Sequence, residues 1–462
     1  MLGLFTELGP FRPNEDMSLS LNPFRWNRIA NIVFMEAPCG VGFSYSNISD
    51  ENDRSDYANN DEGTADDNYA FIQAFLSRFP SYRSNDLYIT SESYGGHYMP
   101  TLARNIVTKN KGATAGSILN FKGFAVGNPY TNIYSGYQSM LETWWNRQLV
   151  SEPTWKNFKH SCIDNEDANE MACRIMAFKV EQEVGDLNVY AMDYPTCKYG
   201  NVLKSIETQQ ENNNKHGISA ELNAQREALL MHMHAHRGID PELLKTFKYS
   251  LKRKYENRIK LQGTTDNENN DGMYAGYEPC GDYFSTQYLN LPEVKSAIHV
   301  KNDIAWEVCA NGDSLEYDYT DSSTSMVPLY EDLLADAETN LRILVFSGDD
   351  DAVCSTLGTQ EWIWDIPSLG HPSSEWQEYS VDGQVSGYIS SWASKKFAFL
   401  TVHGAGHEVP AYMPKVALDI WEKFLQGYWT CDGVDKNGHD ACTVTSLETK
   451  DSTDDPNSNY YK

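Results

Sequence analysis

The sequence predicts an α/β protein in which a mostly parallel sheet is interrupted by a helical insertion. Short β-rich runs alternate with amphipathic helical runs in the first third, and this alternation resumes near Val294. The stretch between them is helical, polar and cysteine-bearing. Because strand–helix–strand alternation places helices on both faces of a parallel sheet, we expect a core built from residues 1–133 and 284–430, an insertion at 134–283 and a C-terminal tail at 431–462.

Three runs in the first third are rich in β-branched and aromatic residues and predict buried strands. These are Asn31–Glu36, Asp86–Thr90 and Phe121–Val126. Apolar residues at helical spacing predict helices at Asn68–Arg78 and Thr101–Thr108.

The second half of the core repeats this alternation. Leu341–Ser347 and Phe397–Val402 predict strands, and Thr356–Trp364 and Lys415–Gln426 predict helices. The insertion contains a polar segment, Leu203–Gly272, with three alternating histidines in MHMHAH. Alternation spreads the histidines around a helix, and no carboxylate or thiol motif completes a metal site. We therefore expect a solvated helix there and no metal site. For the protein as a whole we expect no metal or organic cofactor.

Composition narrows the class of protein. The 462-residue chain carries a formal charge of −28, which argues against a nucleic-acid partner. Two interpretations of the charge stay open: a soluble, self-repelling surface, or an acidic working compartment. No apolar run reaches the length of a membrane span, and the first ten residues do not resemble a signal peptide. Nine cysteines suit an oxidising compartment, and Asn47 begins a glycosylation sequon.

A candidate nucleophile follows the second predicted strand. In Ser91-Glu92-Ser93-Tyr94-Gly95 a serine stands between a strand and a helix, the setting of a nucleophile elbow. Small residues two positions before and after the nucleophile allow the tight turn, although Ser91 stands where glycine is usual. An ordinary turn serine is the alternative interpretation.

Two later strand ends supply the partners that Ser93 would need. Asp351 follows the strand Leu341–Ser347, and His407 follows the strand Phe397–Val402. The chain order Ser, Asp, His is that of hydrolases of the α/β class. In that arrangement His407 takes the proton of Ser93, while Asp351 orients the imidazole and stabilises its charged form.

At these residues the sequence resembles the serine carboxypeptidases, over nearly the whole chain. The shared motifs are Thr6–Pro10, Asn22–Asn27, Glu36–Pro38, Gly40–Ser46, Glu92–Gly96, Gly348–Asp351 and Gly406–Pro410. The resemblance implies an α/β-hydrolase core with a helical cap over the active site, and a peptidase that removes C-terminal residues. It also favours Asp351 over Asp349 and Asp350, and His407 over His403.

The resemblance implies that Glu92, hydrogen-bonded to Glu7, binds the C-terminal carboxylate of the substrate. Two carboxyl groups in contact cannot both ionise cheaply, so one should keep its proton and donate a hydrogen bond. This predicts peptide hydrolysis favoured at acidic pH. The alternative for Glu7 is a structural turn carboxylate. Glu92 also favours peptidases over the related acyltransferases, which usually carry Asp at this position.

Acidic residues near the predicted histidine bear on specificity. By the resemblance, Glu408, with weaker help from Asp282, favours Lys or Arg before the scissile bond. The alternative is that Glu408 is an exposed surface acid. The backbone N–H of Tyr94 is the expected oxyanion donor. The family's glycine-rich element, which supplies a second donor, lies upstream of the segment matching Met1, so we expect the core to lack its N-terminal part.

The family spacing implies disulfides Cys162–Cys173 and Cys197–Cys280. Cys431 and Cys442 flank a short loop and are expected to pair. Cys39 and Cys354 are interpreted as free thiols near the cleft, and the expected partner of Cys309 belongs to the glycine-rich element.

Together these observations predict a serine-type carboxypeptidase that acts on peptide or protein C-termini through an acyl-enzyme. The expected location is the secretory pathway: vacuolar, lysosomal or extracellular. The alternatives are an acyltransferase on the same scaffold, and a non-catalytic binding protein.

Overall fold

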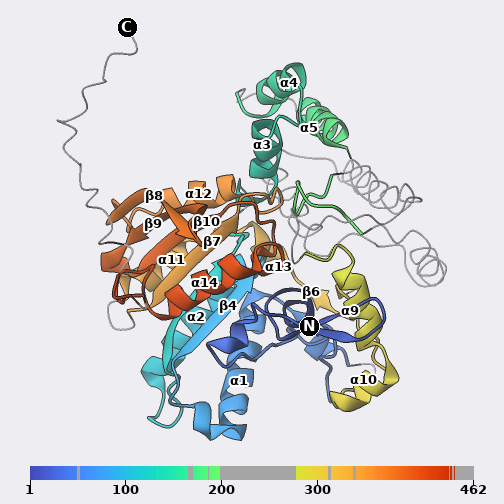
Figure 1. Cartoon of the computed structure of the whole chain (residues 1–462), viewed down its shortest axis with the longest axis vertical. Helices are drawn as coiled ribbons and strands as arrows, with labels where there is room; N and C mark the ends of the chain where they lie inside the picture. The colour runs from blue at the N-terminus through green and yellow to red at the C-terminus, as the bar shows by residue number, and fades with distance from the viewer. Residues whose placement is uncertain are drawn as a thin grey trace.

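A computed structural model describes residues 1–48, 53–132, 134–164, 170–185, 187–197, 277–310, 314–336, 340–435, 437–439 and 442. Its central element is a six-stranded mixed sheet in the order β4-β5-β7-β10-β9-β8 (Figure 1). The strands are β4 Leu87–Glu92, β5 Phe121–Gly127, β7 Arg342–Gly348, β8 Ser374–Val381, β9 Gln384–Trp392 and β10 Phe397–Val402. The first four in spatial order run parallel, and β9 and β8 continue the sheet antiparallel. The predicted α/β class is confirmed.

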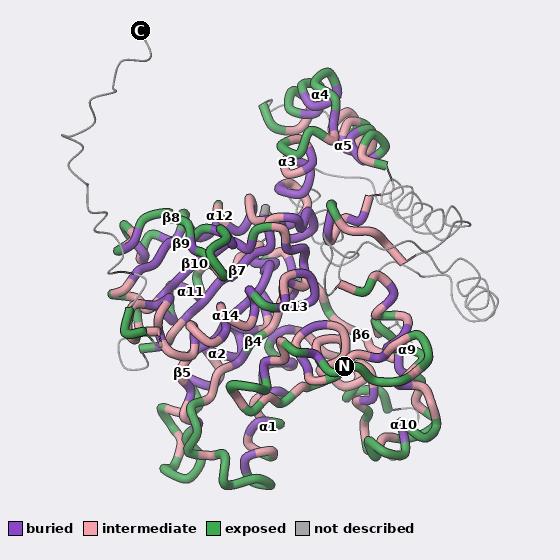
Figure 2. The backbone as a smooth tube through the Cα atoms, viewed as in Figure 1, coloured by how far each residue is buried: buried purple, intermediate pink, exposed green. Residues whose placement is uncertain are grey.

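Helices cover both faces of the sheet because successive strand residues point to opposite sides. In β5, Phe124 and Val126 pack toward one face, whereas Ala125 packs toward the other. The first face is covered by α1 Asp61–Arg78, α2 Gly95–Gly112, α11 Val327–Ala335 and α12 Thr356–Trp364. The second is covered by α13 Val409–Tyr412 and α14 Pro414–Leu425. Figure 2 shows the central strands β5, β7 and β10 buried, whereas the edge strand β8 is largely exposed.

The inserted segment forms a separate helical layer, the cap, beyond one end of the sheet (Figure 1). Its described helices are α3 Ser139–Asn146, α4 Glu152–Cys162 and α5 Glu170–Val184. Their apolar faces form a small core of their own, in which Trp144, Trp155 and Phe158 are buried. Ala352, the residue after Asp351, also belongs to that core. The cap therefore packs directly on a loop of the sheet.

The remaining described elements lie outside the central sheet and the helices named above. They are η1 Gly3–Glu7, β1 Phe11–Pro13, β2 Leu19–Leu21, η2 Trp26–Arg28, η3 Ser55–Tyr57, β3 Ala58–Asn59, η4 Pro80–Tyr82, η5 Tyr134–Gln138, α9 Gly281–Leu289, α10 Pro292–Ala297, β6 Glu316–Tyr317, η6 Thr320–Ser323 and η7 Ala393–Lys395. β1 pairs with β2, and β3 pairs with β6.

One predicted strand is wrong. Asn31–Glu36 alternates exposed and half-buried residues as a strand would, yet it has no strand assignment. Within the described chain it pairs with no strand, and a strand requires a neighbour's backbone groups. Side-chain bonds anchor its end instead: Glu36 accepts from the indole of Trp306 at 2.6 Å and from the backbone N–H of Phe43 at 2.7 Å.

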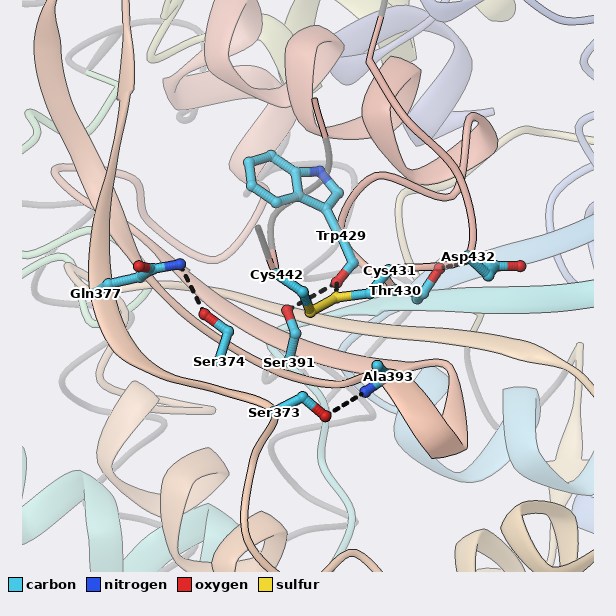
Figure 3. The surroundings of a disulfide bond; sticks show 10 residues. All are labelled: Ser373, Ser374, Gln377, Ser391, Ala393, Trp429, Thr430, Cys431, Asp432 and Cys442. Atoms are coloured by element: carbon cyan, nitrogen blue, oxygen red, sulfur yellow. Dashed lines mark hydrogen bonds between the residues drawn. A yellow bond between two sulfur atoms is a disulfide. The ribbon is translucent and has the colours of Figure 1, made fainter. Parts of the chain in front are cut away.

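The structure contains the three expected disulfides, Cys162–Cys173, Cys197–Cys280 and Cys431–Cys442. Figure 3 shows that the last of these fastens the end of the described chain beside β9, where Ser391 donates a hydrogen bond of 2.7 Å to the carbonyl of Trp429. The histidine-rich run MHMHAH lies outside the described residues. Across the described ranges, no helix has the length and apolarity needed to cross a bilayer.

Candidate active site

Ser93 occupies a strained turn between β4 and α2. Its φ is +62°, a region that non-glycine residues rarely adopt. The turn is so tight that the two glycines after Tyr94 have no room for a side chain. A Cβ on Gly95 would lie 2.6 Å from the Cβ of Ser91, and one on Gly96 would lie 2.1 Å from the carbonyl oxygen of Tyr130. The small residues flanking Ser93 therefore follow from the geometry of the turn.

The neighbouring strand end holds this turn in place. The Ser93 N–H donates to the carbonyl of Gly127 at 3.0 Å, and the Tyr130 N–H donates to the carbonyl of Ser93 at 2.8 Å. Gly127 is the last residue of β5, the strand beside β4, and Tyr130 lies in the loop that follows it. The backbone of Ser93 is thus bonded on both sides, as a strained conformation requires.

Asp351 and His407 form a buried pair at the ends of β7 and β10. His407 Nδ1 lies 2.6 Å from Asp351 Oδ2, and Asp351 is fully buried. Asp351 also accepts from the backbone N–H groups of Val353 at 2.8 Å and Cys354 at 3.2 Å. A carboxylate only accepts hydrogen bonds, so Nδ1 carries a proton and Nε2 of the neutral ring is left to act as a base.

The two aspartates before Asp351 have other partners. Asp349 accepts from His403 Nδ1 and from the Gly404 N–H, both at 2.8 Å. Asp350 is fully buried and forms an ion pair with Arg147, at the end of α3. Burial raises the pKa of Asp350 to about 7, against the attraction of Arg147. Of the three, only Asp351 lies against His407.

Asn128 is a site residue that the sequence analysis missed. It follows β5, and its Nδ2 donates to Asp351 Oδ2 at 3.0 Å while its Oδ1 accepts from the Gly348 N–H at 2.9 Å. Its own N–H donates to the carbonyl of Phe346 at 2.8 Å. The signal was available, because a polar residue at the carboxyl end of a parallel strand lies at the same sheet edge as Ser93.

Besides Asp351, four carboxyl groups form a cluster around Glu7: those of Glu7, Glu92, Asp282 and Glu408. Glu7 is buried at the end of η1 and hydrogen-bonds the side chain of Glu92, the residue before Ser93. The fields of Asp282 and His407 act on the same carboxyl group. Glu408 is half-buried, and Asp282, at the start of α9, is reached by solvent. The ends of β4 and β10 and the start of α9 therefore meet around Glu7.

The electrostatic state of this carboxyl cluster is set by low solvation and mutual repulsion. Burial first, then the charge of Asp282, raises the pKa of Glu7 to about 7, although the hydrogen bond from Glu92 opposes the rise. Burial, with the charges of Asp282 and Glu7, raises the pKa of Glu408 to about 8. Partial desolvation by neighbouring residues also raises the pKa of Asp282, although its side chain is exposed. At acidic pH the cluster holds protons that it can donate.

A segment of the cap, Val189–Asp193, is hydrogen-bonded to the loops that carry Asp351 and His407. The carbonyl of Val189 accepts from the Ala352 N–H at 3.0 Å, and the carbonyl of Tyr190 accepts from the His407 N–H at 2.8 Å. Asp193 N–H donates to the carboxyl group of Asp350 at 2.9 Å. The positions of the acid and histidine loops therefore depend on the cap.

The remaining candidate residues lie around the site or away from it. Tyr94 is buried at the start of α2, directly after Ser93. Cys354 is buried beside Asp351, Cys39 is half-buried and Cys309 is exposed. Asn47 is exposed, and the serine of its sequon lies outside the described residues. Among described residues, no group of three His, Cys, Asp or Glu side chains is arranged to hold a metal ion.

Comparisons with known proteins agree with this geometry. The sequence profile of a family described as "Serine carboxypeptidase" matches residues 1–427. Serine carboxypeptidase-like 26 of Arabidopsis thaliana is 33% identical over 428 residues, covering 92% of this chain and 78% of that protein. Serine carboxypeptidase 24 of the same plant is 33% identical over 429 residues, with the same coverages.

One solved structure shares the fold. The crystal structure of Kex1(delta)p, a prohormone-processing carboxypeptidase from Saccharomyces cerevisiae, matches with a TM-score of 0.59 at 20% identity, over 92% of this chain and 80% of that one.

Proposed function

The chain belongs to the serine carboxypeptidase family, and on that premise we propose that it releases C-terminal residues from peptides through an acyl-enzyme. One observation carries the proposal: the Glu7–Glu92 carboxyl pair lies at the strand end that bears Ser93 and within the field of His407. A general hydrolase needs only the nucleophile, base and acid. A carboxyl pair that shares a proton next to these groups can donate a hydrogen bond. This suits an enzyme that must bind a free C-terminal carboxylate.

The proposed first step is attack by Ser93 on the scissile carbonyl. His407 Nε2 takes the hydroxyl proton, and the imidazolium is stabilised by Asp351, whose Oδ2 lies 2.6 Å from Nδ1. The carbonyl oxygen becomes an oxyanion, for which the Tyr94 N–H is the proposed donor. His407 then protonates the leaving amine, and the acyl-enzyme is hydrolysed by water that His407 activates.

Substrate binding gives the reaction its expected pH dependence. A protonated carboxyl group in the Glu7–Glu92 pair donates a hydrogen bond to the C-terminal carboxylate of the peptide. Because the pKa of Glu7 is raised to about 7, the proton is present at acidic pH and is lost as the pH rises through 7. Peptide hydrolysis should therefore decline above pH 7 more steeply than hydrolysis of esters that lack the carboxylate.

We propose that Glu408 and Asp282 favour Lys or Arg before the scissile bond. The pKa of Glu408 is raised to about 8, so in the empty site this carboxyl group is neutral at acidic pH. A bound cation would favour its ionisation, because an opposite charge stabilises the carboxylate. The preference for basic residues should accordingly strengthen as the pH rises.

Three disulfides among the described residues support a proposed location in the oxidising secretory pathway.

The test uses purified protein, a blocked peptide with a free C-terminus, and the same peptide amidated. We expect release of one C-terminal residue from the free peptide and little from the amide. Ser93→Ala should lower turnover on the order of a million-fold. Substantial peptidase activity in Ser93→Ala would refute the proposed mechanism. Transfer of acyl groups to an alcohol acceptor without net peptide hydrolysis would instead identify an acyltransferase.

A further inference from the structure

A second histidine–carboxylate pair lies behind the nucleophile turn. His97 stands one helical turn after Ser93 on α2 and is fully buried, and its Nδ1 lies 2.9 Å from Asp61 Oδ2. Asp61 is the first residue of α1 and is only 3% exposed. The proposed chemistry at Ser93 uses neither residue.

Two tyrosines complete the surroundings of the Asp61 carboxyl group. Tyr317, in β6, donates from its hydroxyl to Oδ1 at 2.7 Å. The Tyr94 hydroxyl donates to Oδ2 at 3.4 Å, a long bond. Since Asp61 accepts from its partners, the proton on His97 is on Nδ1. A single carboxyl group thus joins the starts of α1 and α2 to β6.

The other ring nitrogen of His97, Nε2, makes a buried imidazole less favourable here than an apolar ring. Nε2 is buried and has no hydrogen-bond partner among the residues that the structure describes. A phenyl ring would have the same flat shape without an unsatisfied polar atom, and buried polar groups without partners are rare in native proteins. The Nδ1–H bond to Asp61 is therefore the property that an apolar ring at this position would lack.

The His97 ring contacts the two residues whose backbones frame Ser93. It stacks on the Tyr94 ring, with centroids 4.7 Å apart and planes 12° apart. It also stacks on the Tyr130 ring, at 5.6 Å and 18°. The N–H of Tyr130 holds the Ser93 carbonyl, and the N–H of Tyr94 is the proposed oxyanion donor. A rotation of the His97 ring would disturb both.

We propose that His97, held by Asp61 and Tyr317, is a positioning residue that keeps the Tyr94 peptide aimed at the developing oxyanion. Preorganised donors stabilise the transition state because they need no reorientation during the reaction. The positive φ of Ser93 makes such support necessary, since a strained turn keeps its shape only when its surroundings hold it. The inference rests on the proposed function, because the oxyanion forms when Ser93 attacks.

Three variants separate the hydrogen bond from the packing. His97→Phe keeps a flat ring and removes the Nδ1–H, and should slow attack by Ser93 by about 10- to 100-fold, part of the effect of losing an oxyanion donor. His97→Asn places an amide N–H near the former Nδ1 and should recover most of that loss. Tyr317→Phe removes one donor to Asp61 and should slow attack by about 3- to 10-fold, an intermediate share of the same effect.

The matched control is Tyr330→Phe. Tyr330 is a fully buried tyrosine of α11 whose hydroxyl has no partner within the described ranges. Losing this hydroxyl should leave the rate within about twofold of wild type, because the Tyr330 ring packs in the core against Phe124 and Trp362.

The direct readout is the rate at which a fluorophosphonate labels Ser93. The Ser93 Oγ–P bond forms, the P–F bond breaks, fluoride leaves, and the hydroxyl proton passes to His407, while the phosphoryl oxygen takes the place of the oxyanion. The second readout compares the affinity for a peptide aldehyde, which forms a tetrahedral adduct, with the affinity for a product peptide. Labelling rate and aldehyde affinity should fall by the same factor, while product affinity stays constant.

Three outcomes would overturn the proposal: labelling of His97→Phe within threefold of wild type, no recovery in His97→Asn, or an equal loss of product and aldehyde affinity. If His97→Phe does not fold, labelling of Tyr317→Phe as fast as Tyr330→Phe overturns it. A wild type that labels but releases no C-terminal residue refutes the proposed carboxypeptidase, while the labelling rates still test His97.

Discussion

Replacing Glu7 by Gln should make the stability of the protein less dependent on pH. Glu7 is buried, hydrogen-bonded to Glu92 and repelled by Asp282, and its pKa is raised from an ordinary 4.5 to about 7. Gln has the shape of a protonated Glu and never ionises. The substitution thus imitates the protonated form of Glu7 at every pH.

The magnitude follows from the linkage between proton binding and folding. The pKa of Glu7 is higher in the folded chain than in the unfolded chain, so the folded state binds this proton more tightly. The stability it contributes is complete below pH 4.5 and is lost as the pH rises through 7. A difference of about 2.5 in pKa, at about 1.4 kcal/mol per pH unit, corresponds to about 3 kcal/mol.

The assay is urea unfolding at pH 5 and pH 8 with the disulfides intact. Glu7→Gln should exceed the unfolding free energy of wild type by less than about 1 kcal/mol at pH 5 and by up to about 3 kcal/mol at pH 8. Glu15→Gln, an exposed glutamate between β1 and β2, is the control and should follow wild type at both values. If Glu7→Gln and wild type lose equal stability between pH 5 and pH 8, Glu7 does not hold the proton.

Three further substitutions test other parts of the site. Glu408→Met should lower the preference for Lys or Arg over Leu before the scissile bond by roughly 10- to 100-fold at pH 8 and by less at pH 5; a wild type that prefers Leu refutes this role. Gly96→Ala would place its Cβ 2.1 Å from a backbone carbonyl oxygen and should abolish fluorophosphonate labelling, whereas Gly112→Ala, in open space on the same helix, should label normally. Arg147→Ala leaves the buried Asp350 without its cation and should cost about 3 kcal/mol in urea unfolding at pH 8. The loss should be smaller at pH 5, where Asp350, whose pKa is already raised to about 7, binds a proton; an equal loss at both values would show that the ion pair is not the cause.

The core strands and helices were predictable because their residues are buried in a regular pattern. β10 and α12 begin and end where the sequence predicts, and β7 differs by one residue at each end. Asn31–Glu36 shows why a local pattern is insufficient: strand formation depends on a neighbour that local sequence does not reveal. The β8–β9 hairpin was missed, although Asp382-Gly383 between the strands, both at positive φ, is a strong hairpin signal.

The arrangement of the candidate site was predictable where it depends on position along a strand. Ser93, Asp351 and His407 each follow a parallel strand, so their shared edge of the sheet follows from the fold class. Contacts between distant segments were not predictable. The bond between Asn128 and Asp351 spans 223 residues of sequence, and the ion pair between Arg147 and Asp350 spans 203. The hydrophobic periodicity of a sequence reflects local structure and does not predict contacts between residues so far apart in the chain.

The hydrogen bonds from Val189–Asp193 to the loops of Asp351 and His407 limit how freely the cap can be exchanged. An insertion attached only at its two ends could be deleted or swapped as a module, leaving the hydrolase core intact. Here the cap accepts hydrogen bonds from the backbone of Ala352 and His407, so its removal would expose those amides to solvent and release both loops. Protein engineering should therefore vary α4 and α5 and retain Val189–Asp193, because this segment also holds the loops that carry Asp351 and His407.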